Sequence, residues 1–140
     1  CWYVNDNKIS HEDQEVVDII IKKIEKKFGT MSKTTGEKHE FLGMDIHYND
    51  KKVMVSMKKH LLKAINSFGE DITKNAATPA TSYLFKVQDA LSEEKSDIFH
   101  SVTAQLLFAG NRCRLDIKTA VAFLCTRVSN PDEDDWKKLK

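Results

Sequence analysis

The sequence contains no long hydrophobic run. Its longest apolar stretch lies around Ile19, Ile20 and Ile21, far short of the roughly 18 residues that a membrane-spanning helix needs. It also lacks the basic start and small-residue cleavage site of a signal peptide. The chain opens at Cys1 and stops at Lys140 inside a predicted helix, so we expect both ends to be cut.

Cysteine is scarce, and neither sign of charge dominates. Cys1, Cys113 and Cys125 form no CxxC pair and lack zinc-ligand spacing, so we interpret them as free thiols of a reducing compartment. The 22 lysines and arginines nearly balance the 21 aspartates and glutamates. A nucleic-acid-binding surface therefore has to come from local clustering of basic side chains. With 41% hydrophobic and 31% charged residues, the composition is that of a globular protein.

The first nine residues predict a tight β-hairpin. Residues 2–4 are aromatic and β-branched and favour a strand, and residues 5–7 are a cluster of turn formers. Residues 8–9 then return as the partner strand. The tip carries the amide of Asn5 beside the carboxylate of Asp6. Such a tip is also an ordinary surface turn, and the residues alone leave both interpretations open.

A second hairpin is predicted further along the chain. Residues 41–48 place alternate apolar side chains on one face, residues 49–50 supply a turn, and residues 52–57 alternate again. Gly43 lies inside the first of these strands, where it indicates a bulge or a close approach of the backbone.

Helical periodicity marks the segments around these hairpins. Ser10 is the expected N-cap of a helix whose apolar residues recur as far as Phe28, with Gly29 at its end. A second helix is predicted over residues 58–68. Its apolar side is formed by Leu61, Ile65 and Phe68.

Residues 70–91 contain Pro79 and show no period, which predicts a linker loop. Apolar residues at helical spacing then predict two helices, one capped by Ser92 and ending near Gly110, the other led by Asp116. Asn130 is the expected N-cap of a last helix, with proline at its first position. The predicted fold class is α+β.

Five blocks, in this order, resemble the copia-type (pseudoviridae-like) retrotransposon reverse transcriptase family over essentially the full chain. Residues 3–6 read Tyr-Val-Asn-Asp, one substitution from the family's Tyr-x-Asp-Asp signature. The other blocks are the helix end at 26–29, the Phe-Leu-Gly strand within 39–46, the proline linker at 76–79, and residues 104–108 with 114–121.

The resemblance implies a partial reverse-transcriptase palm, built of antiparallel hairpins and an amphipathic helix, followed by a mostly helical thumb and connection region. Residues 1–57 are expected to be the C-terminal part of the palm with a primer-grip-like hairpin. Residues 58–91 correspond to a thumb-like helix and linker, and residues 92–140 to a connection toward RNase H.

The resemblance implies catalytic positions at Tyr3, Asn5 and Asp6, with Mg²⁺ held by Asp6 and, in degenerate form, by Asn5. Nucleotidyl transfer uses hard divalent cations, which prefer carboxylate oxygens. Asn5 replaces the family's first aspartate and brings no charge, and the upstream palm aspartate lies outside this sequence. We therefore expect this chain, although similar to an RNA-directed DNA polymerase, to be inactive alone and to bind Mg²⁺ poorly.

The resemblance also implies contacts with primer–template nucleic acid. The expected residues are Phe41, Leu42 and Gly43 in the primer grip and Lys58, Lys59 and Lys63 on the thumb helix. Simple packing of Phe41 and Leu42, and a solvated helix face for the lysines, remain the alternatives.

The partners implied are primer–template, dNTP, and the missing fingers, palm and RNase H portions of the polyprotein, with no membrane. The implied location is intracellular, in a cytoplasmic particle or the nucleus. The alternative function is a non-catalytic nucleic-acid-binding or interaction remnant of the same element.

Overall fold

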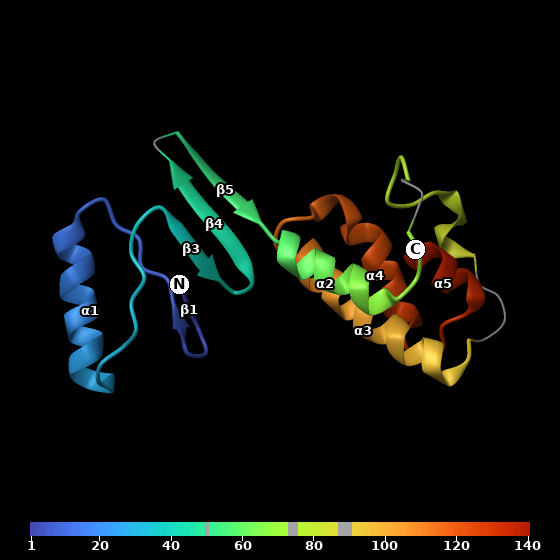
Figure 1. Ribbon diagram of the computed structural model, residues 1–140, viewed down its shortest axis with the longest axis horizontal. Helices are drawn as coiled ribbons and strands as arrows, with labels where there is room; N and C mark the ends of the chain where they lie inside the picture. The colour runs from blue at the N-terminus through green and yellow to red at the C-terminus, as the bar shows by residue number, and fades with distance from the viewer. Residues whose placement is uncertain (50, 73–75, 87–90) are drawn as a thin grey trace. The chain divides into compact units, whose positions relative to one another are not determined.

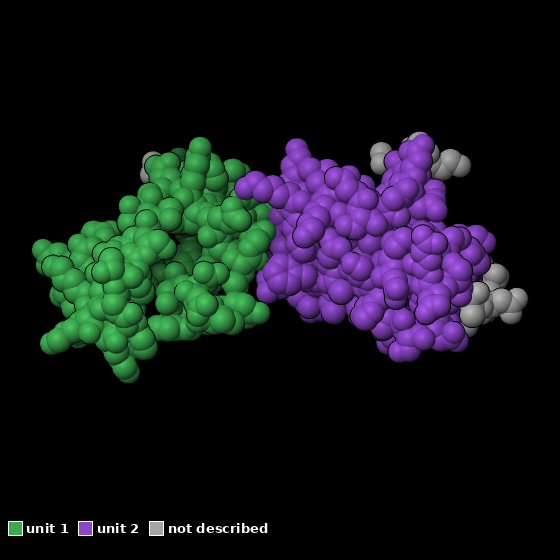
Figure 2. Space-filling view, turned by 60° about the horizontal axis from the view of Figure 1, so that its bottom comes forward, with its two compact units in different colours: residues 1–56 green, residues 57–140 purple. Residues whose placement is uncertain are grey.

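The computed structural model describes residues 1–49, 51–72, 76–86 and 91–140. The chain divides into two compact units, residues 1–56 (unit 1) and residues 57–140 (unit 2), which Figure 1 draws as a ribbon and Figure 2 colours separately. The described residues form five α-helices and two small antiparallel sheets. The α+β class is therefore confirmed at this coarse level, whereas the division into palm, thumb and connection stays a prediction.

The first hairpin of unit 1 pairs β1 (Trp2–Tyr3) with β2 (Asp6–Asn7). The predicted turn over residues 5–7 is wrong, because the two-residue loop is formed by residues 4–5 and Asp6 belongs to the returning strand. The backbone N–H of Lys8 donates to the carbonyl of Cys1 at 2.8 Å, and the Cys1 amino group donates back at 2.7 Å. These two bonds fix the register that aligns Tyr3 with Asp6.

Helix α1 (Gln14–Phe28) follows the first hairpin and ends at Gly29, as predicted. Its N-cap is Asp13, whose carboxylate accepts a bond from the backbone N–H two residues on. The prediction that Ser10 caps this helix is wrong, since the Ser10 hydroxyl instead accepts a bond from the Lys8 ammonium at 2.6 Å. A carboxylate placed directly before the first turn satisfies the helix's unpaired N–H groups better.

The second sheet has the order β3 (Lys38–Phe41), β4 (Met44–Asn49) and β5 (Lys52–Ser56), all antiparallel. The single strand predicted over residues 41–48 is wrong, because Leu42 and Gly43 form a hairpin turn between β3 and β4. Their φ angles of 51° and 72° are the two consecutive positive values of a type I′ turn. Gly43 therefore reverses the chain rather than forming a bulge.

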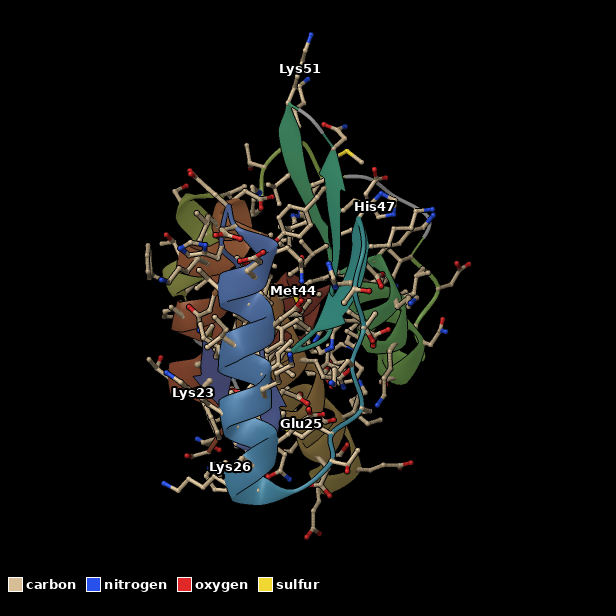
Figure 3. The ribbon with its side chains drawn as sticks, turned by 90° about the vertical axis from the view of Figure 1, so that its left-hand side faces the viewer. Lys23, Glu25, Lys26, Met44, His47 and Lys51 are labelled. Atoms are coloured by element: carbon tan, nitrogen blue, oxygen red, sulfur yellow. The ribbon has the colours of Figure 1, made fainter. Side chains whose placement is uncertain are left out.

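Unit 1 has little buried core in its described part. Ile46 on β4 is 6% exposed, whereas helix α1 has no buried residue despite its apolar side. At the end of α1, Phe28 is 62% exposed and meets Trp2 edge-on, with ring centroids 6.1 Å apart. Figure 3 shows Lys23 and Lys26 on the outward side of this helix.

Unit 2 is helical and better packed. Its elements are α2 (Lys58–Phe68), the 3-10 turn η1 (Ser82–Phe85), α3 (Glu93–Gly110), the 3-10 turn η2 (Leu115–Ile117), α4 (Lys118–Arg127) and α5 (Glu133–Leu139). Its core cluster consists of Phe68, Phe99, Val102, Leu124 and Trp136. The centroids of the Phe68 and Trp136 rings lie 4.7 Å apart, so aromatic stacking joins α2 to α5.

Several predictions for unit 2 are confirmed and others are wrong. Ser92 occupies the N-cap position of α3 as expected, although its side chain makes no capping hydrogen bond, and the helix ends at Gly110. Ile65 is 46% exposed and lies outside the buried side of α2, because small Ala64 lies there instead and lets α2 approach α3 closely.

The linker and the last helix also differ from prediction. The described part of the predicted loop over 70–91 contains η1, whose Leu84 side chain is buried. The N-cap of α5 is Asp132, two residues after the predicted Asn130, because only the Asp132 carboxylate completes a capping box with Asp135. Residue 50 of the predicted second turn and linker residues 73–75 and 87–90 lie outside the described residues.

Candidate functional site

The tip of the first hairpin holds the residues that the resemblance assigns to catalysis. Tyr3 and Asp6 are cross-strand partners, and the loop between them is Val4-Asn5. Tyr3 is 52% exposed, and Asn5 and Asp6 are also exposed. The tip therefore presents one phenol, one amide and one carboxylate to solvent.

The backbone beside these side chains is strained. Val4 has a φ of 50°, a value that β-branched residues rarely adopt and that costs about 1–3 kcal/mol. A positive φ at the first loop residue alone is the type II′ arrangement, whose first position glycine normally fills. The Trp2 indole N–H donates to the Val4 carbonyl at 2.9 Å and so helps to hold this turn.

A groove of about 720 Å³ lies within unit 1 and is lined by residues of the β1–β2 hairpin, of α1 and of the second sheet. Figure 2 shows that the surface of this unit is hollowed. Among the groove's lining residues are Asn5 and Asp6 from the first hairpin, Phe41 from β3 and Ile21 from the apolar side of α1. Of the predicted site residues, the structure therefore joins Asn5, Asp6 and Phe41 in one groove.

Aromatic and charged side chains line another part of this groove. The Lys8 ammonium lies over the Tyr48 ring, 5.0 Å from its centroid, and His39 meets the same ring edge-on at 5.8 Å. The groove also includes Lys33, which pairs with Glu25 at 2.9 Å. The hydrogen bond from Lys33 lowers the pKa of Glu25. The groove thus combines apolar, aromatic and cationic surface.

The other predicted nucleic-acid contacts lie outside this groove. Leu42 and Gly43 occupy the β3–β4 turn and are not among the residues that line the groove. Lys58, Lys59 and Lys63 belong to unit 2, where their side chains are exposed on α2. They form a local basic cluster of the kind that a near-neutral chain requires for binding phosphates.

The hairpin does not fit the two-cation site that the resemblance implies. It supplies a single carboxylate, Asp6, while Asn5 adds a neutral amide oxygen. In the part of the chain that the structure describes, no group of three or more His, Cys, Asp or Glu side chains is placed to hold a metal ion. Hard divalent cations beside a triphosphate need several anionic oxygens, which these residues do not provide.

The last block of the resemblance forms a local ion pair. The Arg114 guanidinium donates two bonds to the Asp116 carboxylate, at 2.9 and 2.7 Å. The hydrogen bond between them raises the pKa of Arg114 and lowers that of Asp116. Leu115 between them is 68% exposed and begins η2, which directly precedes α4.

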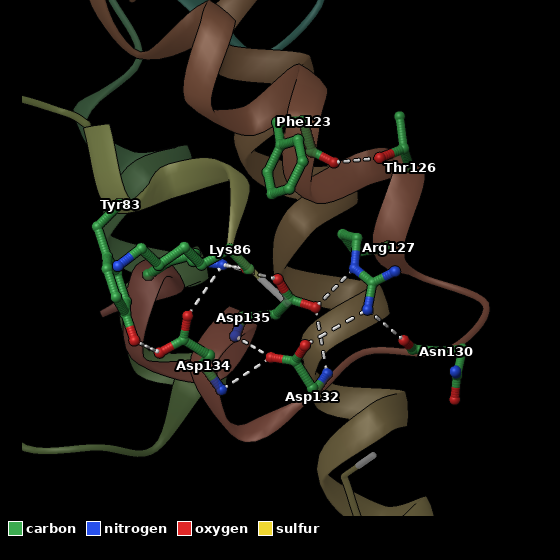
Figure 4. Close-up of polar contacts among 10 residues, drawn as sticks. Tyr83, Lys86, Phe123, Thr126, Arg127, Asn130, Asp132, Asp134 and Asp135 are labelled. Atoms are coloured by element: carbon green, nitrogen blue, oxygen red, sulfur yellow. Dashed lines mark hydrogen bonds and ion pairs between the residues drawn. The ribbon is translucent and has the colours of Figure 1, made fainter. Parts of the chain in front are cut away.

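Unit 2 contains a buried polar network that its sequence does not predict (Figure 4). Asp132, Asp134 and Asp135 are each at most 1% exposed. Arg127 donates to Asp135 at 2.9 Å, and Lys138 pairs with Asp134 at 3.1 Å. The acidic run from 132 to 135 resembles an ordinary helix start, and nothing in its local pattern signals that these carboxylates are buried.

The network also holds the linker. Tyr83 of η1 donates its hydroxyl hydrogen to Asp134, and the Lys138 ammonium donates to the carbonyl of Lys86. Phe85 packs edge-on against Phe123 of α4 at 5.1 Å. Residues 82–86 are therefore fixed to the helices of unit 2.

Comparisons of the chain with protein-family models, with curated proteins and with solved structures find no match. Within the described ranges, no helix combines the length and apolar character needed to cross a bilayer. The residues and their geometry are therefore the basis for a functional proposal.

Proposed function

We propose that this chain is a palm, thumb and connection segment of an RNA-directed DNA polymerase from a copia-type retrotransposon, and that it is inactive alone. The observation that carries this proposal is the unit 1 groove, whose lining includes Asn5 and Asp6 from the polymerase-like turn and Phe41 from the primer-grip-like strand. The five sequence blocks in family order support the same assignment.

Each group in the groove has a role in this proposal. Phe41 offers an apolar surface to the primer end, and Asp6 offers its carboxylate near the hairpin tip. In the parent enzyme, Mg²⁺ supplies charge stabilisation for transfer of the nucleotide to the primer. Asn5 lacks the anionic oxygen needed there, and the loss of one such charge is expected to reduce the rate by orders of magnitude.

The proposal extends to the parent's partners. These are primer–template nucleic acid, dNTP, and the fingers, palm and RNase H portions of the polyprotein, within an intracellular particle or the nucleus. The apolar side of α1, which has no buried residue, is where we place contacts with the rest of the palm.

Primer extension on an RNA or DNA template, with Mg²⁺ or Mn²⁺, tests the absence of activity. We expect no product from this chain or from Asn5→Asp. The variant restores one carboxylate of the turn, but the upstream palm aspartate still lies outside this sequence. A matched control is the inactive variant Asp6→Asn. Templated product from the wild-type chain above that from Asp6→Asn would contradict the proposal.

A second candidate function is a non-catalytic nucleic-acid-binding remnant. The exposed cluster of Lys58, Lys59 and Lys63 on α2 favours it. Each lysine that neutralises a phosphate steepens the salt dependence, and the slope of log K against log salt changes by about 0.9 per contact.

Binding to a labelled primer–template duplex at several salt concentrations tests this second function. Replacing the three lysines by glutamine is expected to weaken binding and to reduce the slope by about 2 to 3. The matched control replaces Lys22, Lys23 and Lys26 of α1, an equal change of charge on another helix. Binding that ignores salt, or equal losses from both triple variants, would exclude a specific role for the α2 cluster.

A further inference from the structure

Strand β5 (Lys52–Ser56) forms an edge of the three-stranded sheet, since the order is β3-β4-β5. Every residue of β5 is exposed, and its central residues are apolar: Val53 is 57%, Met54 57% and Val55 44% exposed. An exposed apolar edge strand is a template for pairing with another strand. The opposite edge, β3, instead alternates charged Lys38 and Glu40 with its other residues, which protects it from pairing.

The backbone register shows which amides of β5 face outward. The Tyr48 N–H donates to the carbonyl of Glu37 at 2.7 Å, so the amide of Tyr48 faces β3. Its partner on β5, Val53, therefore belongs to a non-hydrogen-bonded pair. The Lys52 N–H donates to the Asn49 side chain at 2.8 Å and so faces β4. Because backbone groups alternate along a strand, the N–H and C=O groups of Val53 and Val55 point away from the sheet.

We propose that a second copy of this chain pairs with this edge, β5 against β5, antiparallel about a two-fold axis at Met54. In this register Val53 of each copy lies opposite Val55 of the other. Both residues have outward amides, so the two valine pairs form hydrogen-bonded pairs that exchange two bonds each. Met54 then faces Met54 of the second copy in a non-hydrogen-bonded pair, where side chains lie closest.

Side-chain charge and polarity fit the same register. Lys52 lies opposite Ser56 of the second copy, so no like charges oppose one another within β5. Cross-strand partners share a face, and Val53 and Val55 pair with Tyr48 and Ile46 on β4. The valines of both copies therefore extend one apolar face across the axis. The interface is isologous, as two-fold symmetry requires.

The pairing is expected to be weak. One pair of short strands buries less than the roughly 1,200 Å² of a stable interface, so dimer formation depends on protein concentration. Sedimentation equilibrium of the full chain over a wide concentration range measures it directly. We expect a monomer–dimer equilibrium for the wild type, and a chain that stays monomeric at every concentration would overturn the proposal.

Charge variants at the axis locate the interface. Met54→Lys and Met54→Glu each place like charges face to face and are expected to weaken dimerisation about tenfold. An equimolar mixture of the two opposes unlike charges and should regain the dimer. Leu115→Lys, at a residue 68% exposed in unit 2, is the matched control and should dimerise like the wild type.

A second variant tests the backbone bonds. Val55→Pro removes an outward N–H while leaving the bonds to β4, and it should abolish dimerisation without loss of monomer structure by circular dichroism. Three outcomes would each overturn pairing at this edge. Met54→Lys could dimerise as strongly as the wild type, or the mixture of Met54→Lys and Met54→Glu could stay monomeric. The third is loss of the dimer in Leu115→Lys. These outcomes do not depend on polymerase or nucleic-acid-binding activity.

Discussion

The Tyr83 hydroxyl donates a hydrogen bond of 2.7 Å to a carboxylate oxygen of Asp134, 51 residues further along the chain. Asp134 is 1% exposed, and its other oxygen pairs with Lys138 at 3.1 Å. This bond joins the 3-10 turn η1 to the first turn of α5. It explains how a segment predicted as loop becomes part of the folded unit.

Tyr83→Phe is expected to lower the free energy of unfolding of unit 2 by about 1–3 kcal/mol, because a buried carboxylate loses a donor. Urea denaturation followed by Trp136 fluorescence, in a Trp2→Phe background, measures this change. Tyr3→Phe, at an exposed tyrosine of unit 1, is the control and should change stability by less than about 0.5 kcal/mol. Equal effects of the two substitutions would contradict a role for the Tyr83–Asp134 bond.

The same pair predicts how stability depends on pH. Burial by itself raises the pKa of Asp134, but the hydrogen bond from Tyr83 and the pairing with Lys138 outweigh it, so the net shift is downward. The unfolded chain therefore binds more protons near its pKa of about 3.9, and this contribution is present above that pH and lost as pH falls through the folded pKa.

At alkaline pH the sign reverses. Donation to Asp134 raises the pKa of Tyr83, so its contribution is present below the unfolded pKa of about 10 and lost as pH rises through the folded value. Urea midpoints measured between pH 3 and 11 should fall at both ends for the wild type. In Tyr83→Phe, the urea midpoint should decrease less at alkaline pH than in the wild type. An equal decrease in both proteins would contradict a contribution of Tyr83 to the alkaline pH dependence.

Asp132→Ala is expected to destabilise unit 2 by about 1–2 kcal/mol through loss of the α5 cap. The Asp132 carboxylate accepts backbone N–H bonds from Asp134 and Asp135, at 2.8 and 2.7 Å. Glu133→Ala on the neighbouring residue removes only a surface pair with Lys95, which contributes about 0.2–1 kcal/mol. Thermal unfolding compares the two variants, and a larger loss from Glu133→Ala would refute the capping role.

Val4→Gly is expected to stabilise the first hairpin by about 1 kcal/mol, since glycine adopts a positive φ without strain. Val4 is 73% exposed, so little packing is lost. Hydrogen exchange at the Lys8 amide, which bonds to Cys1, reports on this hairpin. Slower exchange in the variant is the expected result, while faster exchange would show that the turn is not strained at this position.

Local sequence patterns predicted much of the fold. The apolar spacing from Val17 to Phe28 and the glycine after it predicted α1, because helix periodicity and a C-terminal glycine are local properties. The same holds for the start of α3 after Ser92 and for its end near Gly110. Turn positions were less predictable: Asn5, Asp6 and Asn7 are all turn formers, and the strand register selected the Val4-Asn5 loop.

The candidate site was also predicted only in part from the sequence. The residue types at Asn5, Asp6 and Phe41 were read from the sequence, but only the folded chain shows that all three line one groove. Tyr3, Leu42 and Gly43 match the family pattern equally well, yet they lie outside the groove lining. Proximity between segments some 35 residues apart is a property of the folded chain and has no local signal.

The sequence by itself determined the α+β class and the main helices, because those depend on short-range periodicity and capping. Tertiary structure alone decided that the Asp134 and Asp135 carboxylates are buried. Tyr83, which donates to Asp134, lies 51 residues away in the sequence, and burial of charge depends on such distant neighbours. The outward amides of Val53 and Val55 likewise follow from strand order and register, which only the assembled sheet defines.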